Sequence, residues 1–402
     1  MYICTHSSTY ICMRLEIRSA GRYSKVKVSC SKAALVSGVQ TVYKAVSAKP
    51  TIPALSGVLV ETCPQGLRLV AYDLELGIET FIPVTIGKEG STVIPARYFS
   101  EISRKLPQAE VVLEFREETQ SVTISAGRAD FVVKTMPAIE FPALPEIPEA
   151  NSWSIPEGEL KTMIRRTAPA AAVDDARAFF KGIYTLFEKD SLTMVATDSF
   201  RLAHRKTSAA FDMDEPVDVI IPAKALLEVE RNLNEAGERE VSIAIAENHA
   251  MFRIGTTTYV TRLLEGQFPN YKQVFPQNIP ARIICDRLQL LDCVDRVSLM
   301  CKDELSAIRM SYTGDEGMAS GFLTIAATTP EVGEGREDIP VSMIGHAEVT
   351  VAMRARYLRD VLRVLDGDEV CLGYTSFKHP IEVTEETDPS YTYLLMPVTA
   401  PV

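Results

Sequence analysis

The sequence predicts an α+β fold made of three tandem copies of one domain, each with two helices packed on antiparallel sheets. Three observations support this prediction. One helical segment occurs three times at long intervals, the stretches between the copies alternate apolar and polar residues as strands do, and proline-rich linkers recur at the spacing of the helices. A period this long indicates whole domains laid end to end, because solenoid repeats are only about 20 to 50 residues long.

The repeated helical segment opens in each copy with an alanine followed by a cation. These pairs are Ala96-Arg97, Ala223-Lys224 and Ala355-Arg356, so the copies lie 127 and 132 residues apart. Apolar side chains then recur at the spacing of one stripe of an amphipathic helix. The stripe consists of Phe99, Ile102 and Leu106 in the first copy, Leu226, Val229 and Leu233 in the second, and Leu358, Val361 and Leu365 in the third.

The first domain is expected over 26–148, after an extension over 1–25 that we expect to be disordered or artefactual, since Met13 offers an alternative start. Pro50 ends the first helix, because the residue before a proline avoids helical geometry. A proline-rich crossing over 141–148 closes the domain as a linker. The expected elements are helices over 31–49 and 95–106 and strands over 57–61, 67–71, 77–83, 111–115, 121–126 and 131–136.

The second and third domains, expected over 149–276 and 277–402, repeat this order. The second linker begins with Phe268-Pro269, 127 residues after Phe141-Pro142. In the third domain, the acidic, glycine-rich stretch 331–338 is expected to form a turn. The expected elements are helices over 160–168, 222–233, 287–302 and 354–365 and strands over 182–187, 191–196, 201–206, 240–246, 251–255, 259–264, 307–312, 321–327, 370–374, 380–384 and 391–397.

Composition restricts the class of protein. Apolar residues make up 46% and charged residues 24% of the 402, which is ordinary for globular domains that bury a core. No run of 18 apolar residues occurs, so no segment is expected to span a membrane. The eight cysteines contain no Cys-x-x-Cys pair and the five histidines no His-Glu-x-x-His pattern. We therefore expect reduced thiols in a cytoplasmic protein, with neither a metal nor another cofactor.

Charge is unevenly distributed along the chain. The net charge is −11, but the helical windows 31–49, 94–106, 160–168, 221–233, 287–302 and 353–365 together carry +12, which leaves −23 for strands and loops. If the helices share one surface, it forms a positive lining inside an acidic body and can hold phosphates without reading bases. The alternative is that these cations are simply solvated on helix faces.

No catalytic constellation is readable in the sequence. A Gly-x-x-x-x-Gly-Lys phosphate loop and a Gly-x-Ser-x-Gly elbow are both missing from it. Asp198 in Thr197-Asp-Ser-Phe-Arg201 could pass for a catalytic acid, but Asp73 holds the equivalent place in the first domain. A residue repeated between domains is better explained as closing a turn after a strand.

Several motifs occur together in the order of one known family. They are Lys49-Pro-Thr-Ile-Pro53, Ile94-Pro-Ala-Arg97, Val195-Ala-Thr-Asp-Ser-Phe-Arg-Leu-Ala203, Glu265-Gly-Gln-Phe-Pro-Asn-Tyr-Lys-Gln-Val-Phe-Pro276 and Leu394-Leu-Met-Pro397. With the threefold repeat, they make residues 26–398 resemble the bacterial sliding clamp, the beta subunit of DNA polymerase III.

This resemblance implies a crescent that closes as a head-to-tail homodimeric ring, with sheets outside and helices lining a hole around duplex DNA. It also implies a processivity factor that tethers a polymerase and is not an enzyme. The candidates to face DNA are Lys49, Arg97, Lys224 and Arg356. Phosphate contacts of this kind are independent of base sequence, which suits a ring that slides.

The resemblance further implies a pocket between the second and third domains that takes short linear peptides from the replicative polymerase, the clamp loader and repair proteins. Apolar walls would desolvate a leucine or phenylalanine anchor, and a methionine can adapt its shape to it. Taken singly, each residue could instead serve ordinary core or linker packing. The positions that carry over are Phe180, Thr197, Ser199, Phe200, Arg201, Leu202, Pro269, Val274, Leu305, Pro380, Met396, Pro397 and Val398.

The chain departs from the family pattern at several positions. Ser199-Phe200 stands where the family often has Gly-His, and Gln273 replaces a cation. We therefore expect a bulkier pocket floor, one charged contact fewer and a shifted peptide preference. Asp174 and Ala178 stand where some relatives contact DNA, so that contact is not expected here.

Two other classes of function are left open. A DNA-modifying or hydrolytic enzyme would need an acid-base or metal set that the sequence does not display. A specialised clamp paralogue or a non-DNA scaffold would keep the repeat and the pocket but lose the positive lining. Retention on circular DNA that is released on linearising it separates that class from a DNA clamp.

Overall fold

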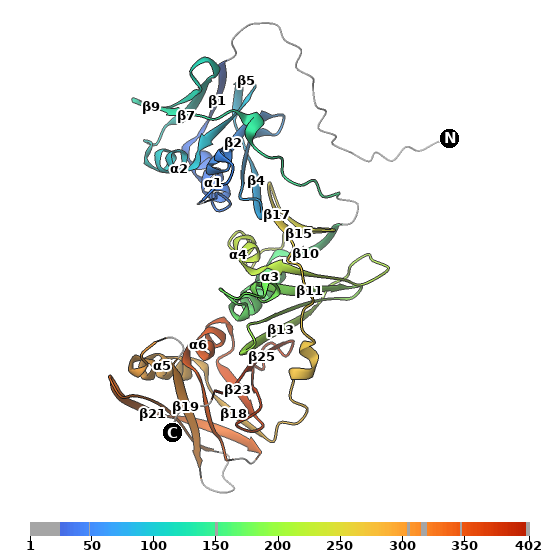
Figure 1. Ribbon diagram of the computed structural model, residues 1–402, viewed down its shortest axis with the longest axis vertical. Helices are drawn as coiled ribbons and strands as arrows, with labels where there is room; N and C mark the ends of the chain where they lie inside the picture. The colour runs from blue at the N-terminus through green and yellow to red at the C-terminus, as the bar shows by residue number, and fades with distance from the viewer. Residues whose placement is uncertain are drawn as a thin grey trace.

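The computed structural model of the chain describes residues 25–47, 49–148, 152–303, 306–314, 320–345 and 348–398. These residues form an elongated arc of three successive α+β units, and the helices of all three units lie along its concave, left-hand side in Figure 1. The predicted fold class is therefore confirmed, because three sheet-rich domains of one kind follow one another along the chain. The expected extension over 1–25 lies outside the described residues except for Lys25.

The first unit packs its two helices against each other and on its strands. Helix α1 begins after Ser31, whose hydroxyl caps the first turn, and it ends at Tyr43. The expected end at Lys49 is wrong, because the N–H groups of Ala45 and Val46 bond to carbonyls three residues back and turn the chain out of the helix. The elements are β1 (Lys25–Ser31), α1 (Lys32–Tyr43), β2 (Gly57–Cys63), β3 (Gly66–Tyr72), β4 (Leu76–Ile82), β5 (Thr85–Lys88), β6 (Ser91–Pro95), α2 (Ala96–Lys105), β7 (Glu110–Arg116), β8 (Ser121–Ala126) and β9 (Ala129–Lys134).

The second unit repeats this plan. Its second helix ends at Glu230 and not at 233 as expected, because Asn232 and Leu233 donate to carbonyls three residues back and tighten the chain into a turn. The elements are β10 (Ser152–Pro156), α3 (Glu157–Thr167), β11 (Gly182–Glu188), β12 (Ser191–Thr197), β13 (Arg201–Ser208), β14 (Val217–Pro222), α4 (Ala223–Glu230), β15 (Glu240–Ala246), β16 (His249–Ile254) and β17 (Thr257–Arg262).

The third unit replaces one predicted turn by a strand. The expectation of a turn over 331–338 is wrong, because strand β21 (Gly333–Gly345) runs through it and pairs with β20 (Ser320–Thr329) along most of its length. Strand β20 provides hydrogen-bond partners for the backbone of β21. This pairing stabilises the strand although its polar, glycine-rich composition favours a turn. The other elements are β18 (Ala281–Asp286), α5 (Arg287–Val297), β19 (Ala307–Gly314), β22 (Thr350–Arg354), α6 (Ala355–Val364), β23 (Glu369–Tyr374), β24 (Ile381–Thr384) and β25 (Tyr391–Leu395).

The repeated apolar stripe faces the core in every unit. Phe99, Leu226 and Leu358 are each 0% exposed, and among the nine stripe residues only Ile102 is half-buried. Burying a side chain of this size stabilises the fold by about 1.5–3 kcal/mol. The amphipathic helices predicted from the repeat are therefore confirmed.

Two sheets in the described part of the chain cross from one unit to the next. Strand β4 pairs antiparallel with β17, where Ile78 lies opposite Tyr259, in an eight-stranded sheet of order β10-β15-β16-β17-β4-β3-β2-β6. Strand β13 pairs antiparallel with β25, where Ala203 lies opposite Tyr393, in a twelve-stranded sheet of order β14-β11-β12-β13-β25-β24-β23-β18-β21-β20-β19-β22. A five-stranded sheet of order β5-β1-β7-β8-β9 lies within the first unit. Backbone hydrogen bonds thus join the three units into one arc.

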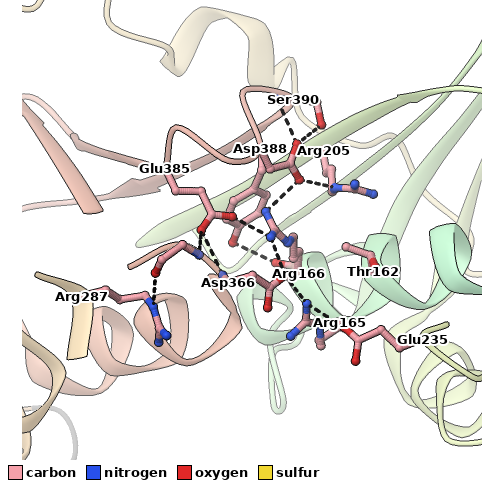
Figure 2. Close-up of polar contacts among 12 residues, drawn as sticks. Thr162, Arg165, Arg166, Arg205, Glu235, Arg287, Asp366, Glu385, Asp388 and Ser390 are labelled. Atoms are coloured by element: carbon pink, nitrogen blue, oxygen red, sulfur yellow. Dashed lines mark hydrogen bonds and ion pairs between the residues drawn. The ribbon is translucent and has the colours of Figure 1, made fainter. Parts of the chain in front are cut away.

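Buried charges reinforce the junction between the second and third units (Figure 2). Arg166 of α3 is 3% exposed, and its guanidinium contacts Asp366 at 2.8 Å, Glu385 at 2.6 Å and Asp388 at 2.8 Å. Arg205 of β13 also pairs with Asp388 at 2.8 Å. Burial alone would lower the pKa of Arg166, but the three carboxylates raise it, so the guanidinium stays charged.

Candidate functional site

The turn between β12 and β13 supplies the first part of the expected peptide pocket. Asp198 accepts hydrogen bonds from the N–H groups of Phe200 at 3.0 Å and Arg201 at 3.1 Å, and Thr197 Oγ1 donates to the Arg201 carbonyl at 2.7 Å. These bonds hold Ser199 in the left-handed region, at φ 75°. The turn therefore presents the Phe200 side chain in a fixed direction.

The first unit carries the same turn. Asp73 accepts hydrogen bonds from the N–H groups of Glu75 at 3.0 Å and Leu76 at 2.7 Å. Leu74 takes the left-handed conformation, at φ 76°. The prediction that this repeated aspartate closes a turn is confirmed.

Arg201 lies beneath the turn and not at its surface. The side chain is 5% exposed, pairs with Asp198 at 3.0 Å and with Asp360 of α6, and lies 4.2 Å from the ring centroid of Tyr357. Burial alone would lower the pKa of Arg201, but its neighbours Tyr393, Asp360 and Asp198 raise it overall. The residue fixes the turn against the third unit and does not offer an open cation to a peptide.

Phe200 forms the exposed aromatic surface of this turn. Its ring is 42% exposed, and the guanidinium of Arg354 lies 4.1 Å from the ring centroid. The Phe200 carbonyl accepts a hydrogen bond from the Met396 N–H at 2.8 Å. Met396, Pro397 and Val398 are half-buried, so the end of the described chain runs beside Phe200.

Phe180 lies in the short 3-10 turn before β11 and is 4% exposed. The guanidinium of Arg177 lies 4.2 Å from the Phe180 ring centroid and pairs with Asp175 at 3.1 Å. The same guanidinium donates to Ser199 Oγ at 3.5 Å. This contact brings the segment that carries Phe180 to the turn that carries Phe200.

The remaining expected pocket residues are placed less uniformly. Leu202 and Pro380 are buried, and Val274 is 41% exposed at the end of a 3-10 turn in the linker. Pro269 lines a separate cavity along the same linker. Leu305 lies outside the described residues.

Sequence reasoning missed Arg354, Tyr357 and Asp360, which the third unit contributes to this region. One signal could have revealed Arg354. It stands directly before the repeated alanine, where the other two copies have Pro95 and Pro222. The loss of a proline that both other copies share indicates a side chain with a local task.

Three of the expected DNA-facing cations hold equivalent places near the starts of α2, α4 and α6, helices on the concave side in Figure 1. The side chains of Arg97, Lys224 and Arg356 are 76%, 75% and 38% exposed, and they pair with Glu101, Asp73 and Asp360 at 3.4–3.9 Å. Exposed pairs of this kind are weak, so phosphates can compete for the cations. Lys49 is exposed in the loop after α1.

The prediction that helix cations form a positive lining needs a correction. In every unit, a cation of the first helix donates to a carbonyl at or just beyond the end of the second helix, where cations interact favourably with the helix dipole. Arg165 and Arg166 of α3 are likewise engaged, with acidic residues of the third unit. The +12 counted from sequence therefore overstates the charge available to a ligand. The three repeated bonds run from Lys32 to Leu106, from Lys161 to Leu233 and from Arg287 to Leu362.

The described ranges hold neither a candidate metal centre nor a membrane-spanning helix. No three of their His, Cys, Asp and Glu side chains are grouped so that they could hold a metal ion. None of their helices has the length and apolarity needed to cross a bilayer.

Comparison with known proteins identifies each unit. Residues 26–145 match the N-terminal domain of the DNA polymerase III beta subunit, residues 154–270 its central domain and residues 272–399 its C-terminal domain. The chain is 32% identical to the beta sliding clamp of Bacillus subtilis over 382 residues, which cover 93% of this chain and 99% of that protein. It is 29% identical to the beta sliding clamp of Staphylococcus aureus over 363 residues, which cover 88% of this chain and 94% of that protein.

Solved structures agree with the sequence comparison. The DNA polymerase sliding clamp of Bacillus subtilis has a TM-score of 0.86 and 32% identity, with 94% of this chain and 100% of that chain covered. A sliding clamp of Pseudomonas aeruginosa bound to griselimycin has a TM-score of 0.86 and 28% identity over the same shares. The chain therefore belongs to the family of the DNA polymerase III beta subunit, the bacterial sliding clamps.

Proposed function

We propose that two copies of this chain close head to tail into a ring that encircles duplex DNA and tethers a DNA polymerase. The role is that of a processivity factor and not of a catalytic subunit, as in the rest of the family. The observation that carries the proposal is a pair of open sheet edges at opposite ends of the arc.

The two internal junctions follow one rule. In the first unit, β4 is the third strand of a meander, and it pairs with β17, the last strand of the second unit. In the second unit, the equivalent strand β13 pairs with β25, the last strand of the third unit. Each junction therefore joins a third meander strand to the last strand of the unit that follows.

One strand of each kind has no such partner among the described residues. Strand β21, the third meander strand of the last unit, pairs with β20 and, over Ser342–Gly345 only, with β18. Strand β9, the last strand of the first unit, pairs with β8 and with no other described strand, at the edge of its sheet. Phe131 and Val132 on β9 are 41% and 69% exposed, and exposed apolar edge strands are templates for pairing with another chain.

A second copy can satisfy both edges at once. The β9 edge of each chain would pair with the β21 edge of the other, and Figure 1 shows these strands at opposite ends of the arc. A head-to-tail contact of this kind closes into a ring when the rotation per unit permits. The concave helices would then surround a hole that exposes Lys49, Arg97, Lys224 and Arg356 to the DNA backbone, without base recognition.

The turn at Phe200 would form one wall of a pocket for short linear peptides from the polymerase, the clamp loader and repair proteins. Its half-buried neighbour Met396 adds apolar surface, the buried Phe180 lies behind the turn, and the Pseudomonas aeruginosa relative was solved with griselimycin bound. A protein that tethers a polymerase in this way would act in the cytoplasm, with the chromosome.

Two measurements test the ring. Sedimentation velocity should give twice the mass of one chain at micromolar concentration, and a single-chain mass would contradict the proposal. Protein loaded onto nicked circular DNA should stay bound through gel filtration and should leave when the circle is cut once. A non-DNA scaffold with the same fold would show the dimer mass without retention on the circle.

A further inference from the structure

A cavity of about 670 Å³ lies along the linker that follows the second unit. Strand β14, the tight turn at Glu247 and Asn248, and the linker segment from Leu263 to Tyr271 form its walls. Its volume lies within the range of sites that bind small molecules or peptide side chains. The turn at Phe200 does not contribute to it, and Pro269 is the one expected pocket residue among its walls.

The walls of this cavity are acidic. Asp218, Glu247 and Glu265 line it, and no lysine or arginine does. Within the described residues, neither Asp218 nor Glu247 takes part in an ion pair, and Glu265 meets only the exposed Arg262, at 3.3 Å. Carboxylates in a concave site raise the local concentration of cations and exclude nucleic-acid phosphates.

Aromatic rings cover another wall. Tyr184 and Phe268 stack with their ring centroids 5.1 Å apart, and Tyr271 lies 6.0 Å from Tyr184. Tyr271 is 8% exposed, and its hydroxyl makes no hydrogen bond to any described residue. Burial, and then the charge of Asp218 beside it, raise the pKa of Tyr184 to about 12, so its ring stays neutral next to that carboxylate.

We infer that this cavity binds an arginine- or lysine-bearing extended segment of a partner protein. Carboxylates neutralise the cationic head, aromatic faces receive a guanidinium or ammonium, and the apolar stem of such a side chain can lie along Phe268. Asn248, Gln267 and Asn270 supply amides that can bond to an extended backbone. Apart from Pro269, the cavity shares no lining residue with the expected peptide pocket, and it does not depend on ring formation.

The test uses the full chain and a fluorescein-labelled peptide, Gly-Arg-Ser-Arg-Gly, which lacks the apolar anchors that the other pocket would need. Binding is followed by fluorescence anisotropy at fixed ionic strength. The test variant carries Asp218→Asn, Glu247→Gln and Glu265→Gln. A matched control carries Asp214→Asn, Glu215→Gln and Glu240→Gln, three exposed acids of the same unit that do not line the cavity. Both variants change the net charge equally, so they separate the site from the general acidity of the chain.

We expect the test variant to lose at least tenfold in affinity and the control to change by less than twofold. Equal losses in both variants, or no saturable binding to the parent chain, would overturn the inference. Spermidine serves as a competitor of the same charge class without a peptide backbone. Displacement of the peptide by spermidine at lower concentration than by unlabelled peptide would assign the cavity to a polyamine and overturn the peptide assignment.

Discussion

The two junctions inside the chain share a backbone device but differ in their side chains. At both, an antiparallel strand pair crosses from one unit to the next. The first junction adds a contact between the hydroxyls of Thr80 and Thr257 at 2.9 Å and an ion pair of the exposed Lys224 with Asp73 at 3.9 Å. The second adds the buried network around Arg166, which Figure 2 displays.

This difference indicates where the arc is stiff. Buried ion pairs contribute little net stability, but breaking one is costly, because its partners are left charged and desolvated. Small displacements at the second junction are therefore penalised, while those at the first disturb mainly exposed or neutral groups. The second junction is also the one that holds Phe200 against Arg354 and Met396, so we expect the proposed peptide pocket to keep its shape if the arc bends at the first junction.

Arg166→Met should have the largest effect, because it removes the central cation of the second junction. The change keeps the apolar stem but leaves Glu385, whose side chain is 0% exposed, without its cation. The free energy of unfolding should fall by about 3–5 kcal/mol, measured by urea denaturation. Hydrogen exchange should rise in β25 and stay constant in β4. Arg97→Met, at an exposed helix position, is the control and should leave both unchanged; equal exchange in the two strands would show that the junctions do not differ.

Val132→Asp extends the comparison to the junction proposed between two chains. A carboxylate on the β9 edge would be desolvated by a second copy, so the dimer dissociation constant should rise about 100-fold, or roughly 2.7 kcal/mol. Sedimentation equilibrium measures it. Ile139→Asp, at a residue 93% exposed in the same unit but outside β9, should leave the constant unchanged. A dimer that tolerates Val132→Asp would place the contact elsewhere.

Asp388→Asn probes the charge dependence of the stiff junction. Burial alone would raise the pKa of Asp388, but hydrogen bonds from Ser390 and Arg205 lower it below its ordinary value. Its stabilising contribution is thus complete above the unfolded-state pKa and disappears as the pH falls through the lower folded-state pKa.

The variant should cost about 1.5–3 kcal/mol at pH 7 and progressively less as the pH falls towards 3. Urea titrations at several pH values measure this. Asp214→Asn, an exposed residue, serves as the control. A cost that did not depend on pH would assign Asp388 a steric role instead of an ionic one.

Thr257→Val gives the smallest expected effect and concerns the first junction alone. The change keeps the shape but leaves the Thr80 hydroxyl, in a residue 5% exposed, without its partner. The free energy of unfolding should fall by about 1 kcal/mol. Hydrogen exchange should become faster in β4 and stay unchanged in β25. Thr258→Val on the same strand, which makes no such contact among the described residues, is the matched control.

Sequence reasoning succeeded where a feature repeats or is local. The alanine-cation start of each second helix, the apolar stripe and the Asp198 turn each depend on residues within a dozen positions of one another. It failed where partners are distant: Arg166 and Asp388 lie 222 residues apart, and Arg166 therefore looked like a lining cation. It failed also at β21, because only its pairing with β20 turns a polar, glycine-rich stretch into a strand.

By itself, the sequence determined the number of units, the amphipathic helices within them and the family, because periodicity and ordered motifs are properties of the chain alone. The tertiary structure decided which cations are buried in the junctions, which cap helices and which remain on the concave side. That choice depends on burial and on partners brought together by strand pairing across units. Burial and distant partners cannot be inferred from the sequence alone, because an arginine position looks the same whether its guanidinium is solvated or lies in a buried ion-pair network.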